Sequence, residues 1–381
     1  MGLFKRKQPV SNNSILIPTK SRNVSQPIYS DLPDPLEHQL YNNLCHSVPI
    51  IGAAITKIIR LTGNYTVECS DHNMQKALDY FLSSVPVGVS SISIQSFTDV
   101  YLESLLMYGN ALGEIVIDPK ARCITSLYCA MPDRIIIHKG TKSDECQYFH
   151  RCSDSEKPVP VRHPERIVFT AMNPPPDGIY GVSILHGLPA LSQILLRIYE
   201  CIGQNYDRIG NVRYAVTYRP SNDPSERAYA GERAKIIAKE WSEGMKAGSR
   251  GEVRDFVCAG DVDIKVIGAE NPLLNTEIPV RQLLEQIVSR LSIPPFLLGL
   301  NWSSTERMST QQSDILTSEL EYFRRLLTPV IIKISSAFLR LSGSQADVQV
   351  IWDNINLQDE TELAMARLHN AQAMEIEKRI Q

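Results

Sequence analysis

Hydrophobic and polar positions in the first half of the chain alternate between helical and strand-like spacing. Residues 48–61 carry apolar side chains three and four positions apart, which gives one apolar face along a helix, and residues 97–108 show the same pattern. Strict alternation of apolar and polar positions predicts short strands at residues 65–69, 111–117, 134–138, 147–150 and 166–170. Because these elements do not form a regular βαβ series, the sequence predicts a mixed α+β fold.

Three long helices dominate the second half. The first follows a run of prolines at residues 174–176, which cannot be helical, and Ser183 is its expected N-cap. The second is predicted at residues 279–292. The third covers residues 310–341 and should bend at Pro329, whose ring removes one N–H and clashes with the carbonyl four residues earlier. Between the first two lies an insert with a charged helix and short strands, at residues 226–245, 212–218, 253–258 and 262–267.

Polar segments separate or end these elements. Residues 1–47 are rich in Asn, Ser and Pro and are predicted to form a loosely ordered arm. Residues 348–352 alternate like a strand, and a charged helix is expected from Asp359 onward. Residues 299–307, in the break between the second and third helices, are polar except for Leu300 and Trp302. A tryptophan after a helix break often fills a core, but these polar neighbours also suit an exposed functional loop.

Composition and charge limit the classes of protein to consider. Of the 381 residues, 43% are hydrophobic and 21% are charged, as in a folded globular protein. The net charge of −3 argues against a protein that grips nucleic acid by neutralising phosphates, but not against one that lets it slide past. No apolar stretch predicts a membrane span or a signal peptide, and Arg6 does not fit the myristoylation motif. We therefore expect a cytoplasmic protein whose eight cysteines are reduced.

Sequence motifs for catalysis are missing, including the phosphate-binding loop of ATPases and the nucleophile elbow of hydrolases. Asp261 and Asp263 have the spacing of a Mg²⁺ site, yet two solvated carboxylates on a short strand are the simpler interpretation. One cluster that contains zinc-ligand residue types fits no common spacing template: Cys146, His150, Cys152 and His163. We therefore expect a protein without catalytic residues, metal or cofactor. The narrow apolar stripes of the long helices instead favour packing against copies of the same chain.

Four short sequences, MYGNALGEIVID at residues 107–118, DGIYGVS at 177–183, LSIPPFLLG at 291–299 and EYFRRLLTP at 321–329, occur in a fixed order. In order and spacing they resemble the portal proteins of tailed bacteriophages with the HK97-like fold, and the similarity covers residues 45–355. Each sequence alone is weakly specific, whereas the four together form a specific signal. The resemblance implies an α/β wing, a two-helix stem, a small α/β clip, a kinked long helix and a short helical crown.

The resemblance also assigns residue ranges to these parts. They are the arm (1–47), wing (48–182), first stem helix (183–209), clip (210–272), second stem helix (273–295), tunnel loop (296–310), kinked helix with wing strand (311–357) and crown (358–381). The family's crown is often longer, so a role of the crown in sensing a full head is not carried over to this chain.

In function, the resemblance implies a ring, usually of twelve subunits, at one capsid vertex of the virion, assembled in the host bacterial cytoplasm. Double-stranded DNA would be packaged through this ring by the terminase large subunit and later ejected. Further partners would be the major capsid and scaffolding proteins and the head-completion (adaptor) and tail proteins. Binding to a membrane is not expected. The implied tunnel-loop residues that face the DNA are Leu300, Asn301, Trp302, Ser303, Ser304, Thr305, Glu306 and Arg307, and the implied clip residues for docking are Arg219, Arg250 and Arg254.

Two other functions stay open at this point. One is another phage structural protein, such as a minor head or baseplate subunit, which would differ in stoichiometry and symmetry. The other is a Mg²⁺-dependent phage nuclease, whose cleavage would depend on Asp263.

Overall fold

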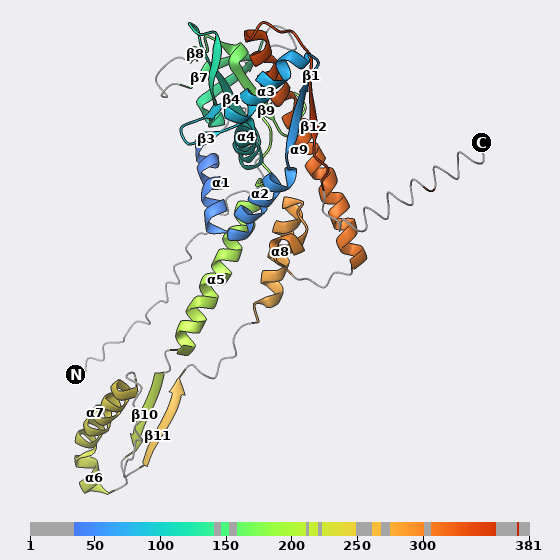
Figure 1. Ribbon diagram of the computed structural model, residues 1–381. Helices are drawn as coiled ribbons and strands as arrows, with labels where there is room; N and C mark the ends of the chain where they lie inside the picture. Colours follow the sequence, from blue (N-terminus) through green and yellow to red (C-terminus); the bar gives the residue numbers. More distant parts are fainter. Residues whose placement is uncertain are drawn as a thin grey trace, which may run out of the picture.

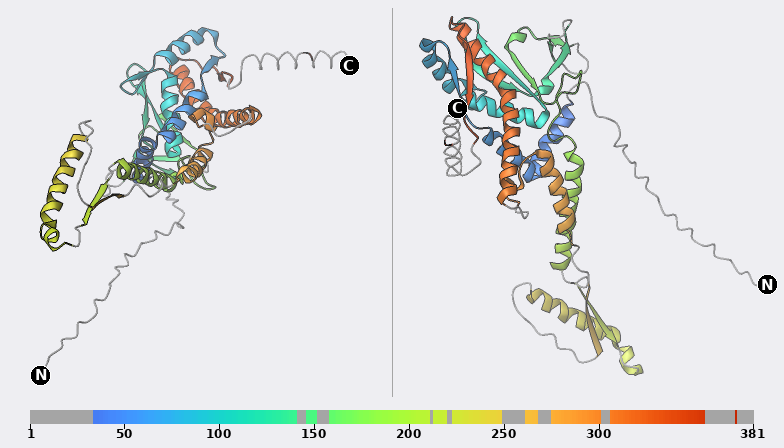
Figure 2. Two further views of the ribbon diagram at one scale, coloured as in Figure 1. Left: turned by 90° about the horizontal axis from the view of Figure 1, so that it is seen from below. Right: turned by 90° about the vertical axis from the view of Figure 1, so that its right-hand side faces the viewer.

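Two helices, α5 (Leu188–Gly210) and α8 (Glu277–Leu291), form a stem that leads from a larger body to a small distal unit in the computed structural model of the chain (Figures 1 and 2). The two stem helices pack against each other along their apolar stripes. The structure describes residues 34–140, 146–151, 158–210, 213–219, 223–248, 261–267, 275–300, 306–355 and 372.

The body begins with four helices, α1 (Pro35–Ser47), α2 (Pro49–Thr62), α3 (His72–Ser84) and α4 (Ile94–Tyr108). Asp34 caps α1 by accepting a hydrogen bond from a backbone N–H of its first turn, and Pro35 suits the first helical position. The prediction of a loosely ordered arm up to residue 47 is therefore wrong for α1. One face of this helix is buried in the body through His38, Tyr41 and Leu44.

A five-stranded sheet in the order β3–β2–β5–β4–β9 packs against α4. Its strands are β2 (Pro86–Val87), β3 (Ser91–Ile92), β4 (Asn110–Asp118), β5 (Cys123–Ala130) and β9 (Ile167–Ala171). Gly113 of β4 leaves room for the ring of Phe97, since a Cβ there would lie 2.7 Å from it. The hydroxyl of buried Tyr101 donates to Thr170 Oγ1 at 2.9 Å and ties α4 to β9.

A smaller sheet of β6 (Ile135–Lys139), β7 (Cys146–His150) and β8 (Val159–Pro160) lies beside the first. Short 3-10 helices precede β6 and β9, namely η1 (Pro132–Arg134) and η2 (Pro164–Arg166). The mixed α+β fold predicted from the sequence is confirmed.

The long helix α9 (Glu306–Leu341) packs against α2, α3 and α4. It buries one apolar side that includes Leu316, Leu320, Leu327, Ile331 and Ile334. After it, β12 (Val348–Trp352) pairs antiparallel with β1 (Tyr65–Cys69), which confirms both predicted strands. This pairing joins the last described strand to the first half of the body.

The distal unit consists of β10 (Arg213–Arg219), α6 (Pro224–Ala228), α7 (Ala230–Gly248) and β11 (Asp261–Ile267). The two strands pair antiparallel. The predicted strand at residues 253–258 lies outside the described residues, as does the predicted helix from Asp359 apart from position 372. Among the described helices none alone is long and apolar enough to cross a membrane; α1 and α2 meet that test as a pair, bent by 99°.

Candidate assembly and channel surfaces

The first two of the four family-like sequences meet at the joint between body and stem. Gly109 ends α4 with φ +73°, and a Cβ there would lie 2.5 Å from the backbone carbon of Val182. A Cβ on Gly181 would lie 2.3 Å from the carbonyl oxygens of both Gly109 and Met172. The two backbone segments therefore touch directly, and only glycine allows this approach.

Side-chain hydrogen bonds complete this joint. Asn110 Oδ1 accepts from the N–H of Gly181 at 2.8 Å, and Ser183 Oγ donates to the carbonyl of Met107 at 2.6 Å. Ser183 also accepts from the N–H of Leu185. The prediction that Ser183 is the N-cap of the stem helix is therefore wrong. Its buried hydroxyl binds the end of α4, and α5 begins five residues later.

The second stem helix is fixed to the same joint by Arg290. Its guanidinium donates to the carbonyl of His186 from Nε at 3.2 Å and to the carbonyl of Ser183 from Nη2 at 3.2 Å. Arg290 lies opposite the apolar stripe of α8, and nothing in the sequence pattern indicates this role. Both stem helices are thus held where they leave the body.

The predicted tunnel loop has a helix at each end, and contacts with the body hold its start. After α8, η3 (Pro295–Leu298) packs against α2, and Gly299 turns the chain with φ +77°. The N–H of Leu300 donates to the carbonyl of Pro295 at 3.1 Å. The next five residues, which include Trp302, lie outside the described residues.

The far end of this loop differs from the prediction, because α9 begins at Glu306 rather than near residue 310. Glu306 and Arg307 therefore belong to the first helical turn and not to the loop.

Two cations of α9, buried Arg324 and the more exposed Lys333, bind backbone carbonyls of the body. Arg324 donates to the carbonyl of Thr62 from Nε at 2.9 Å and from Nη2 at 2.7 Å, and it lies 5.1 Å from the ring centre of Trp352. Lys333 Nζ donates to the carbonyl of Ile167 at 2.5 Å, and partial burial lowers the pKa of this ammonium. The helix continues through Pro329, whose nitrogen cannot donate a hydrogen bond to the carbonyl four residues earlier. The bend expected at Pro329 stays a prediction.

The predicted docking arginines belong to the distal unit, and the structure describes one of them. Arg219 Nη2 lies 3.8 Å from Asp263 Oδ2, and Lys265 Nζ approaches the same oxygen at 3.7 Å. Arg250 and Arg254 lie outside the described residues. Two exposed cations therefore lie within ion-pair distance of Asp263, one of the two aspartates with metal-site spacing.

Metal binding finds little support elsewhere in the part of the chain that the structure describes, where no group of three or more His, Cys, Asp or Glu side chains could hold an ion. Cys146 and His150 occupy opposite ends of β7, and His163 pairs with Glu165 at 3.0 Å. Cys152, the fourth residue of the cluster with zinc-ligand residue types, lies outside the described residues.

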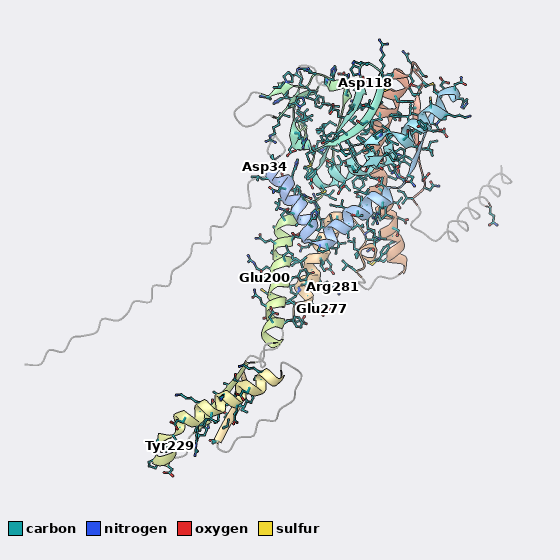
Figure 3. The ribbon with its side chains drawn as sticks, turned by 60° about the vertical axis from the view of Figure 1, so that its left-hand side comes forward. Asp34, Asp118, Glu200, Tyr229, Glu277 and Arg281 are labelled. Carbon is teal, nitrogen blue, oxygen red and sulfur yellow. The ribbon has the colours of Figure 1, made fainter. Side chains whose placement is uncertain are left out.

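The stem exposes apolar side chains that its own partner helix does not cover. Along one side of α5, Leu196, Tyr199 and Tyr206 are 38%, 46% and 61% exposed. The back of the helix is polar, with Glu200 and Gln204, and Figure 3 labels Glu200 on the outer surface of the stem. An apolar stripe of this length on an exposed helix is typical of a surface that packs against another chain.

No protein-family model matches the chain, and no curated protein matches it in sequence. Solved structures match its fold. A chain in the neck of an empty gene transfer agent (GTA) particle, computed with C6 symmetry, gives a TM-score of 0.64 at 17% identity over 93% of this chain and 92% of that chain.

A chain in the neck of a native GTA particle, computed with C12 symmetry, gives 0.62 at 16% identity over 88% of this chain and 89% of that chain. An HK97 family phage portal protein from Corynebacterium diphtheriae gives 0.41 at 14% identity over 84% and 96%. The protein thus has the fold of the GTA neck chains.

Proposed function

We propose that this chain is the portal subunit, or head–tail connector, of a tailed phage or a related particle. Copies would form a ring at one capsid vertex, through which double-stranded DNA is packaged and later ejected. The observation that carries the proposal is the fold shared with a GTA neck chain over 93% of this chain. That match omits fewer residues than the distal unit spans, so it includes at least part of the body, the stem and the distal unit.

The exposed side of α5 supports assembly with further copies of the chain. Leu196, Tyr199 and Tyr206 are apolar or aromatic and would be covered if neighbouring stems packed side by side. A ring needs such a contact on every subunit, and the neck of the native GTA particle is a C12-symmetric assembly. We infer a ring of twelve subunits.

In this proposal the body is the wing and the distal unit is the clip. The helices at the two ends of the loop after Leu300 would hold residues 301–305 at the narrowest part of the channel, with Trp302 toward the DNA. The exposed side chain of Arg219 would belong to the surface that meets the terminase or an adaptor protein. Particle assembly in the host cytoplasm and contacts with capsid, scaffolding and tail proteins belong to the same proposal.

The direct test is electron microscopy of the purified full-length protein, together with its mass in solution. Rings with a central hole and about twelve subunits are expected, in line with closed cyclic symmetry. A double Tyr199→Ser, Tyr206→Ser variant should weaken the ring, whereas Gln204→Ser on the polar back of α5 should not. A strictly monomeric wild-type protein, or an assembly without a hole, would refute the proposal.

The place of Trp302 needs a structure of the assembled ring. Side chains 302–305 should line the channel at its narrowest point. A ring in which this segment packs into the body would show that the loop does not contact DNA.

A nuclease function is less well supported, since two cations, Arg219 and Lys265, lie beside Asp263 where a Mg²⁺ site would need further oxygen ligands. Mg²⁺-dependent DNA cleavage that disappears in Asp263→Ala would support the nuclease instead. A minor head or baseplate subunit would differ from the portal in the number of copies per assembly.

A further inference from the structure

We propose that α1 is a pH-sensitive latch between the body and the stem, and that protonation of His38 releases it. The helix contacts α2 and α4 of the body and also α5 of the stem, so it spans the joint described above. Figure 3 labels Asp34 at its start, beside the body. The proposal concerns the single subunit and does not depend on the ring.

The imidazole of His38 sits inside this contact without a hydrogen bond to its Nδ1. The residue is only 5% exposed, and Nδ1 has no partner among the described residues. Its ring packs against Tyr108 of α4, with 4.4 Å between ring centres. A neutral imidazole fits such a site as an aromatic ring, whereas an imidazolium would add a buried charge and a donor without an acceptor.

Charged groups around His38 come from three places, and they do not remove this cost. Asp34 and Glu37 of α1 and Asp133 of η1 favour the charged form, while Arg151 after β7 opposes it. Glu37 already accepts a hydrogen bond from the hydroxyl of Tyr41. From α4, Tyr108 adds an aromatic face that lies near the Glu103 carboxylate and the Cys45 thiol.

Burial is the largest influence, and it holds the pKa of His38 below the usual value of 6.5. A histidine whose pKa is lowered by docking stabilises the docked state above pH 6.5. That stabilisation is lost as the pH falls below 6.5, because the released histidine binds the proton more tightly. Acid should therefore favour release of α1.

The chain also has a pivot for this movement. Helices α1 and α2 meet at an angle of 99°, and Val48 between them is extended with φ −118°. Rotation about Val48 would free the buried side chains of Tyr41 and Leu44 while α2 stays in the core. The stem would then lose one of its contacts with the body.

Hydrogen exchange of the full-length protein, read by mass spectrometry on peptides that cover α1 and corrected for the intrinsic rate, tests the latch. Between pH 7.5 and pH 5.0 the opening constant of α1 should rise by up to about thirtyfold, the limit for a histidine that ionises at pH 6.5 only when released. His38→Phe should abolish this pH dependence. His46→Gln should keep it, because His46 is exposed on the same helix and its Nδ1 contacts only the carbonyl of Asn42.

Equal protection of α1 at both pH values in the wild type would overturn the proposal, as would a His38→Phe variant with the wild-type response. If phenylalanine leaves α1 unprotected even at pH 7.5, His38→Met replaces it, since the flexible methionine adapts to irregular space. Exchange of the imidazole C2 hydrogen in the wild type gives the ionisation midpoint of His38 independently. A midpoint at or above pH 6.5 would also refute the latch.

Discussion

Substitution of Gly181 by alanine tests whether the body–stem joint depends on direct backbone contact. The new Cβ would lie 2.3 Å from two carbonyl oxygens and 2.4 Å from the amide nitrogen of Met172. All three are backbone atoms, so no side-chain rotation relieves the overlap, and the two segments must separate by about 1 Å.

That separation would break two hydrogen bonds, from the Gly181 N–H to Asn110 and from the Val182 N–H to Met172. At about 1 kcal/mol for each bond, plus about 1–3 kcal/mol for overpacking, the expected loss of stability is about 3–5 kcal/mol.

The measurement is the denaturation midpoint of the body, followed in the full-length chain beside a matched variant. Gly244→Ala introduces the same methyl group into α7, where it would meet no neighbouring segment of the described residues within 4 Å, and should stabilise that helix by about 1 kcal/mol. If Gly181→Ala unfolds within about 1 kcal/mol of the wild type, the close approach does not control stability. Equal losses in both variants would show that the effect is not specific to the joint.

Three further outcomes can be measured on single variants or on the wild type. Arg324→Met should lower the unfolding free energy by about 3 kcal/mol in denaturant titrations, because it leaves the buried carbonyl of Thr62 without its donors; a loss below 1 kcal/mol would contradict this. Ser335→Ala should raise the free energy by about 1 kcal/mol, since the fully buried Ser335 hydroxyl has no partner among the described residues, and a loss would refute the reasoning. Burial raises the pKa of Cys129 to about 12, so only a very small fraction of this thiol is the reactive thiolate at pH 7.5. Maleimide should therefore label Cys129 at least 100-fold more slowly than exposed Cys201, and similar labelling rates by mass spectrometry would contradict this.

Elements with a long and regular apolar period were predictable from the sequence, whereas short or half-buried ones were not. The pattern identified α2, α8, α9, β1 and β12 to within a few residues. It missed α3, whose buried residues crowd into the second half of the helix at Leu78, Phe81 and Leu82. It also missed β5, where Leu127 is the only fully buried residue and serine, threonine and cysteine weaken the alternation.

Site residues were hardest to predict where their partners are backbone atoms far away in the sequence. Ser183 lies 76 residues from the carbonyl of Met107 that it serves, and Arg290 lies 107 residues from the carbonyl of Ser183. A backbone carbonyl has no residue-type signature, so nothing in the sequence pairs these positions. Ser183 thus matched the simplest local pattern, that of an N-cap, although the fold uses its hydroxyl elsewhere.

The glycine contact, Arg290 and α1 all act on the stem where it leaves the body, and they differ in strength. The approach of Gly109 to Gly181 is a direct backbone contact held by the hydrogen bonds of Gly181 and Val182, whereas α1 depends on packing around one titratable ring. Release of α1 should therefore leave the joint intact and change only how firmly α5 is held. Because His38 packs against Tyr108, which directly precedes Gly109, the effects of His38→Phe and Gly181→Ala on stability should not add, and a double-mutant cycle would measure the coupling.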